Sequence, residues 1–122
     1  MDQDPSSAPA QPPAPRRRGR ILSGMRPTGR LHLGHFLGAL ANWTRLQDEF
    51  DCFYMVAAWH ALMSEYKDPA ALRAHGLDNV IDWLAAGIDP GRSTIFLQSD
   101  IPEHLELYTV LACVTPIAWL ER

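Results

Sequence analysis

The sequence predicts an α/β fold in which three parallel strands alternate with three helices. Three apolar runs have the length of strands, at residues 20–23, 51–59 and 94–98, and each is followed by apolar residues at helical spacing. Because parallel strands need crossover connections, the alternation indicates right-handed βαβ units with helices on the faces of the sheet. This is the arrangement of the N-terminal half of a Rossmann-like doubly wound sheet.

Residues 1–19 are expected to form a disordered leader ahead of a partial domain at residues 20–122. The leader holds five of the ten prolines together with Ser, Ala and Gln, so it lacks the apolar surface that offsets the entropy of ordering. We interpret its arginine cluster, at residues 16–20, as a solvated charge run in preference to an RNA-binding arm. Asp2, Asp4 and the prolines disfavour a mitochondrial presequence.

The first two units follow the leader. The first strand ends at Gly24, and its helix is marked by Leu33, Phe36, Leu37, Leu40, Trp43 and Gln47. The run at residues 51–59 is almost continuously apolar, which indicates a central strand covered on both faces. Pro69 is expected to open the second helix, whose inward face would comprise Leu77, Val80, Ile81 and Leu84.

The third unit begins after Gly87, which stands where a left-handed residue ends a helix, and Ile88, which is expected to pack back. Asp100 is expected to cap the third helix, with Pro102 in its first turn and Pro116 kinking or ending it. The residues that this helix would bury are Leu105, Tyr108, Leu111 and Ala112. Without the second half of a doubly wound sheet, the first strand would present unpaired backbone groups.

Apolar runs, cysteine spacing and charge exclude several classes of protein. No apolar run is long enough for a membrane span and the N-terminus lacks a secretory stretch, so we expect a soluble, cytoplasmic protein. Cys52 and Cys113 are interpreted as buried thiols of a reducing compartment, since their spacing fits no zinc site. Residues 21–122 carry a net charge of −5, against +2 for residues 1–20, which argues against broad electrostatic capture of nucleic acid.

The segment SGMRPTGRLHLGH at residues 23–35, hereafter the Gly-His segment, carries the chemistry. It joins a strand to a helix start, where unpaired N–H groups and the helix dipole favour an anion by about 0.3 to 1 kcal/mol. Gly24 and Gly29 allow sharp turns, and Gly34 leaves room for a base or ribose. His32 and His35 share a helix face and can both donate to one anion. The alternative is that His32 caps the helix and His35 lies on its solvent face.

A His-X-Gly-His tetrapeptide after a strand resembles the signature of class I aminoacyl-tRNA synthetases. The neighbouring blocks resemble the tryptophan-tRNA ligase family in particular, from about Ile21 to Arg122. They are SGMRPTG, GALANW, CFYMVAAWHAL, GIDP, IFLQSDIPEH and WLER. The resemblance implies ATP-dependent activation of tryptophan to tryptophanyl-adenylate, followed by transfer to tRNA(Trp).

The resemblance also implies roles for individual residues. His32 and His35 would be catalytic and donate hydrogen bonds to phosphate oxygens, and the rest of the ATP site would be Arg26, Thr28, Gly29 and Gly34. Tryptophan would contact Leu22, Gly24 and His60. Magnesium would accompany ATP without a dedicated carboxylate cluster in the protein. The resemblance further implies a homodimer and tRNA binding through regions expected to lie outside residues 1–122.

The sequence departs from the family pattern in two ways. Ala58 stands where the closest subfamily usually has an aspartate, before a Trp59–His60 pair that can also be interpreted as an amphipathic strand end. The family's second half, its lysine-bearing loop and its anticodon-binding helices are expected to lie beyond Arg122. Two alternatives therefore remain: a non-catalytic truncated paralogue, acting as an interaction module or decoy dimer partner, and another nucleotidyltransferase that shares the tetrapeptide.

Overall fold

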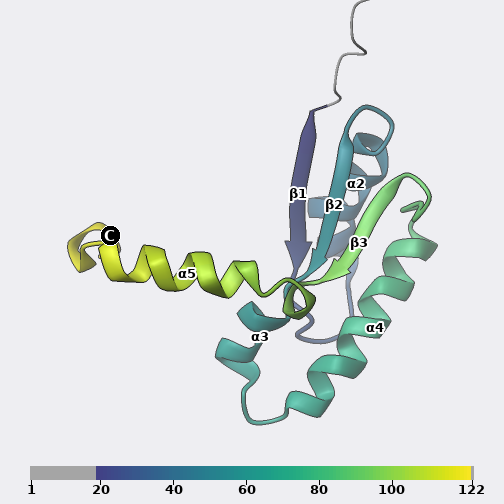
Figure 1. Cartoon of the computed structure of the whole chain (residues 1–122). Coiled ribbons are helices and arrows are strands. Elements are labelled where there is room, and N and C mark those ends of the chain that lie inside the picture. Colours follow the sequence, from purple (N-terminus) through teal and green to yellow (C-terminus); the bar gives the residue numbers. More distant parts are fainter. Residues whose placement is uncertain (1–18, 122) are drawn as a thin grey trace, which may run out of the picture.

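The computed structural model describes residues 19–121, which form a three-stranded parallel sheet with helices packed on one face (Figure 1). The strands are β1 (Arg20–Met25), β2 (Asp51–Val56) and β3 (Ser93–Leu97), in the order β1-β2-β3. The half-sheet predicted from the sequence is confirmed, with β2 in the centre. The predicted leader and most of its arginine cluster lie outside the described residues.

β2 is shorter than predicted. It ends at Val56, and helix α3 (Ala58–Glu65) begins two residues later, so Trp59 and His60 lie on a helix and do not close a strand. Its burial also alternates, with Cys52, Tyr54 and Val56 buried and the residues between them half-buried. The second face of β2 is therefore only partly covered.

Two helical segments cover the same face of the sheet. One is continuous and comprises α1 (Leu33–His35), the π-helical η1 (Phe36–Leu40) and α2 (Ala41–Leu46); the other is α4 (Pro69–Ala85). Trp43 stacks on Tyr54 with ring centroids 4.4 Å apart and meets Trp83 edge-on at 5.2 Å. The Tyr54 hydroxyl donates to the Trp43 carbonyl at 2.9 Å. These three aromatic residues form the centre of the core.

The predicted inward face of α4 is wrong. Leu77 and Ile81 are more than half exposed and Leu84 is exposed as well, whereas the buried residues are Leu72, Gly76, Asn79 and Trp83. The observed buried face of α4 is rotated from the predicted one because Trp83 provides the largest apolar side chain and packs into the aromatic core. Val80 consequently lies at the margin of the core. Pro69 does open α4, Gly87 has a φ of 106° and Ile88 is buried, as predicted.

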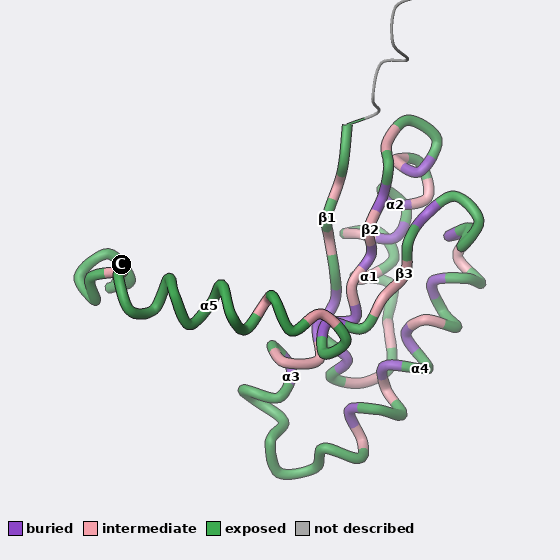
Figure 2. The backbone as a smooth tube through the Cα atoms, in the orientation of Figure 1, coloured by how far each residue is buried: buried purple, intermediate pink, exposed green. Residues whose placement is uncertain are grey.

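The C-terminal elements project away from the sheet. After η2 (Gln98–Asp100), α5 (Glu103–Val114) extends outward and ends before Pro116 as predicted, followed by η3 (Ile117–Trp119) (Figure 1). Asp100 lies in η2 and does not cap α5, whose N-cap position is Pro102. The residues predicted to be buried by α5 are all exposed (Figure 2): Leu105, Tyr108, Leu111 and Ala112.

The exposure of α5 has a physical cause: no described element lies opposite its apolar residues. Cys113, on the same helix, is exposed and free, which corrects the prediction of a buried thiol, whereas Cys52 is buried. β1 hydrogen-bonds to β2 alone among residues 19–121, so the predicted open edge is present. Within those residues no helix combines the length and apolar character that a bilayer crossing requires.

Candidate nucleotide site

The Gly-His segment leaves the sheet at the carboxyl end of β1. Pro27 is fully buried, while Arg26 and Thr28 on either side are exposed. The Thr28 N–H donates to the Arg26 carbonyl at 2.9 Å, and Gly29 has a φ of 139°, a conformation that favours glycine. The predicted sharp turn at Gly29 is confirmed, and the exposed polar groups of this loop can reach a ligand.

Gly24 does not make the predicted turn, because it lies within β1. Its requirement for glycine comes from the neighbouring strand, since a Cβ placed on it would lie 2.5 Å from the Met55 carbonyl oxygen. Gly24 is nevertheless exposed, so its backbone can approach a ligand.

The two histidines of the segment cap the helix reciprocally. His32 is the N-cap residue, and its Nδ1 accepts from the Gly34 N–H at 3.1 Å. The His32 N–H donates in turn to Nδ1 of His35 at 3.3 Å. Their ring centroids are 4.0 Å apart, at an interplanar angle of 47°. A capping role for His32 is therefore real, and it extends to His35.

The capping arrangement determines which ring nitrogens remain for chemistry. Because both Nδ1 atoms accept hydrogen bonds, each neutral imidazole carries its proton on Nε2. His32 is exposed and His35 half-buried. A Cβ on Gly34 would lie 2.9 Å from Cε1 of His32, so glycine lets this ring lie over the first helical turn. The result is two adjacent Nε2–H donors in fixed orientations.

The residues expected to contact tryptophan lie at the carboxyl ends of the strands and on the face of the sheet that no described helix covers. The Ala57 N–H donates to the Met25 carbonyl at 2.8 Å, which joins the end of β1 to the start of α3 and brings His60 to the edge where the Gly-His segment begins. Leu22 is 60% exposed and lines an open cavity of about 460 Å³ with Phe53 and Phe96.

Gln98 is a buried residue that sequence reasoning missed at this edge. Its Oε1 accepts from the Trp59 N–H at 3.1 Å, and α3 has no capping side chain of its own. Its amide also contacts Nδ1 of His60, with Nε2 at 2.9 Å and Oε1 at 3.1 Å. Gln98 therefore fixes the first turn of α3 and the ring of His60.

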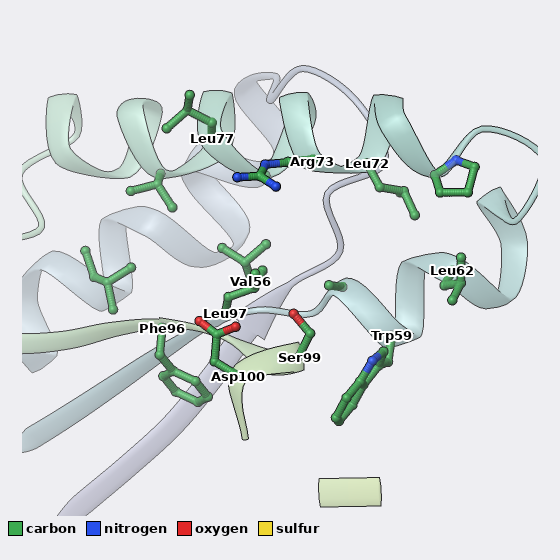
Figure 3. A pocket seen from close by; sticks show the side chains of 15 residues that line it. Val56, Trp59, Leu62, Leu72, Arg73, Leu77, Phe96, Leu97, Ser99 and Asp100 are labelled. Carbon is green, nitrogen blue, oxygen red and sulfur yellow. The ribbon is translucent and has the colours of Figure 1, made fainter. Parts of the chain in front are cut away.

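A second cavity, of about 760 Å³, lies between α3, α4 and the end of β3 (Figure 3). Arg73 and Asp100 stand on opposite walls, and most of the lining is apolar. Ala58 and Trp59 line it, whereas no residue of the Gly-His segment does. Ala58 therefore borders this cavity, and the histidine pair does not.

A parallel half-sheet with a histidine-capped helix at the carboxyl end of its first strand is a Rossmann-like arrangement, and class I aminoacyl-tRNA synthetases share this fold. The family model described as tRNA synthetases class I (W and Y) matches residues 14–122. The chain belongs to this family.

Individual relatives narrow the similarity to the tryptophan enzymes. The tryptophan–tRNA ligase of Ralstonia nicotianae is 55% identical over 103 residues, which cover 84% of this chain and 26% of that enzyme. Tryptophanyl-tRNA synthetase from Campylobacter jejuni, complexed with ADP and tryptophan, superimposes with a TM-score of 0.78 at 38% identity, over 84% of this chain and 32% of that one. The Mycoplasma pneumoniae enzyme gives a TM-score of 0.80 at 32% identity, over 86% and 30%. The chain thus spans about a quarter to a third of these relatives.

Proposed function

We propose that this chain provides the ATP- and tryptophan-binding half of a tryptophan–tRNA ligase. The observation that carries the proposal is the pair of adjacent imidazoles whose capping bonds direct both protons to Nε2. The family match and the ADP and tryptophan bound by the C. jejuni relative support the same assignment. A cytoplasmic location and a homodimeric assembly remain predictions.

The proposed reaction has two steps. A carboxylate oxygen of tryptophan attacks the α-phosphorus of ATP, the bond to the bridging oxygen breaks, and pyrophosphate leaves with the electron pair. The terminal ribose hydroxyl of tRNA(Trp) then attacks the carbonyl carbon of the adenylate, the bond from that carbon to the phosphate oxygen breaks, and AMP leaves with the electron pair while the hydroxyl proton is lost to the departing phosphate or to solvent. His32 and His35 donate through Nε2 to phosphate oxygens as charge accumulates, and a preorganised donor of this kind is typically worth about 10²- to 10³-fold in rate.

The other residues bind and orient the substrates. Arg26 and Thr28 offer exposed polar groups beside Gly29 and Gly34 for ATP, while Leu22, Gly24 and His60 would contact tryptophan. Magnesium would accompany ATP, and phosphates supply most of its ligands in such sites.

Tryptophan-dependent exchange of labelled pyrophosphate into ATP tests the proposal. We expect measurable exchange by the chain and a loss of about 10²-fold or more in His35→Ala, because one Nε2–H donor disappears. His35→Gln keeps a side-chain donor and is the matched variant, expected to retain more activity. Exchange that is absent, or equally fast in His35→Ala, would contradict the proposal.

One observation favours the alternative of a non-catalytic interaction module: α5 and the edge of β1 are exposed. A module of this kind would bind a partner without supporting exchange. A folded, pure chain that binds neither ATP nor tryptophan, yet associates with a longer tryptophan–tRNA ligase, would favour it.

A further inference from the structure

Asn79 is a polar side chain with no exposed surface in the middle of α4. Its amide, oriented with the nitrogen toward both acceptors, donates to the Gly29 carbonyl at 3.1 Å and to the His75 carbonyl at 3.2 Å. The first of these bonds joins α4 to the Gly-His segment, 50 residues earlier in the chain. A buried amide is costly unless it is hydrogen-bonded, so this contact specifies the position of the loop.

A second contact lies one helical turn away. Gly76 packs beneath the fully buried Pro27, because a Cβ placed on Gly76 would lie 3.9 Å from Cβ of Pro27. α4 therefore holds the Gly-His segment at Pro27 by packing and at Gly29 by a hydrogen bond. Gly29 is only three residues before His32, so the helix cap starts from a point that α4 fixes.

We infer that Asn79 is a positioning residue of the proposed ATP site, an inference that rests on the proposed function. By holding the Gly29 carbonyl, it places His32 and His35 so that their Nε2–H groups are preorganised for phosphate oxygens. Asn79 needs no contact with ATP. Loss of its donor leaves the carbonyl of the half-buried Gly29 without this partner and lets the loop move, which weakens a site that depends on sub-ångström placement.

The test compares two buried amides in the complete chain. Asn79→Leu removes the donor and keeps the number of side-chain heavy atoms and the branching at Cγ. Gln47→Leu is the matched control, because the Gln47 amide is also buried but joins Gly87 and Asp89, each at 2.9 Å, near the opposite end of the sheet. Binding of magnesium-ATP is measured by calorimetry and stability by urea unfolding. We expect Kd to rise about tenfold in Asn79→Leu and less than about twofold in Gln47→Leu, although both variants lose stability.

A second readout does not depend on ATP. The Gly34 amide, which donates to His32 Nδ1, should exchange its hydrogen faster in Asn79→Leu than in Gln47→Leu under conditions of matched stability. If Asn79→Leu does not fold, Asn79→Ser is measured in the same way with the same expectations.

The outcomes separate the two claims. A parent chain that does not bind magnesium-ATP contradicts the proposed function, whatever the Gly34 exchange shows. A parent that binds, with equal Kd values and equal Gly34 exchange in the two leucine variants, leaves the proposed function intact and overturns the role of Asn79.

Discussion

The covered face of the sheet and the projecting C-terminal elements are both rich in apolar residues but differ in burial. On the covered face, Tyr54 and Trp83 have no exposed surface and Trp43 has 4%. Beyond the sheet, α5 also carries many apolar residues, yet Val114 is 69% exposed, and Trp119 in η3 is 72% exposed. The strand order β1-β2-β3 explains the difference, because two right-handed crossovers in one direction put both helical segments on the same face. Burial here follows connectivity more than composition.

The largest effect that tests this comparison comes from truncating one tryptophan on each side. Trp83→Ala should lower the free energy of unfolding by about 3 to 5 kcal/mol, because it leaves a cavity in the aromatic core. Trp119→Ala should change it by less than about 0.5 kcal/mol. Urea unfolding monitored by circular dichroism gives both values. Similar losses in the two variants would mean that α5 packs against something in solution.

Substituting two glycines with alanine, one in tight packing and one in open space, tests the same comparison through stability. Gly24→Ala should destabilise the chain by about 1 to 3 kcal/mol, since the new Cβ would meet the Met55 carbonyl oxygen and the strands must shift. Gly38→Ala should stabilise it by about 0.5 kcal/mol, because nothing lies within 4 Å and the residue is helical. A thermal midpoint that does not fall in Gly24→Ala would contradict the β1–β2 spacing, and one that falls in Gly38→Ala would contradict the open space at Gly38.

The sequence alone predicts those features of the fold that depend on a few neighbouring residues. Pro69 and Gly87 marked the ends of α4, and the apolar run after Asp51 marked the central strand. The buried face of α4 was not predictable in this way, because its stripe contains Gly76 and Asn79 among the apolar residues. The exposure of α5 depends on elements that would lie opposite it, which no local pattern describes.

The residues of the candidate site likewise fall into those that the sequence predicts and those that it does not. The Gly-His segment is contiguous, so its histidines and glycines could be proposed as site residues from their local pattern and the family resemblance that it carries. Asn79 and Gln98 were missed because their bonds join residues far apart in the chain. A polar residue one helical turn from Gly76, on a face that also holds Leu72 and Trp83, was the available signal for Asn79. It was hidden by the wrong choice of inward face.

A smaller effect concerns the loss of stability at alkaline pH, which involves Tyr54 on the covered face. Burial, and to a lesser degree a hydrogen bond with Cys52, raises the pKa of the Tyr54 phenol well above its usual value. The folded state therefore holds this proton more tightly, so the stabilisation is complete below about pH 10 and is lost as pH rises beyond it. Tyr54→Phe should cost about 1 kcal/mol near neutral pH, through the lost bond to Trp43, and should flatten the alkaline decline. Tyr108→Phe, on exposed α5, should leave the decline unchanged in urea unfolding at several pH values.

The smallest effect on stability is expected for an ion pair whose two side chains are both exposed. Arg92 pairs with Asp48 between the start of β3 and the turn after α2, and the two side chains are 47% and 59% exposed. Solvent screens such a pair, so Arg92→Met should lower the free energy of unfolding by about 0.5 kcal/mol or less, and salt should reduce the difference further. Unfolding with and without about 0.5 M sodium chloride measures both quantities. A loss above about 2 kcal/mol that persists in salt would show that Arg92 stabilises this end of the sheet through more than a screened ion pair, and that the covered face depends on more than its aromatic core.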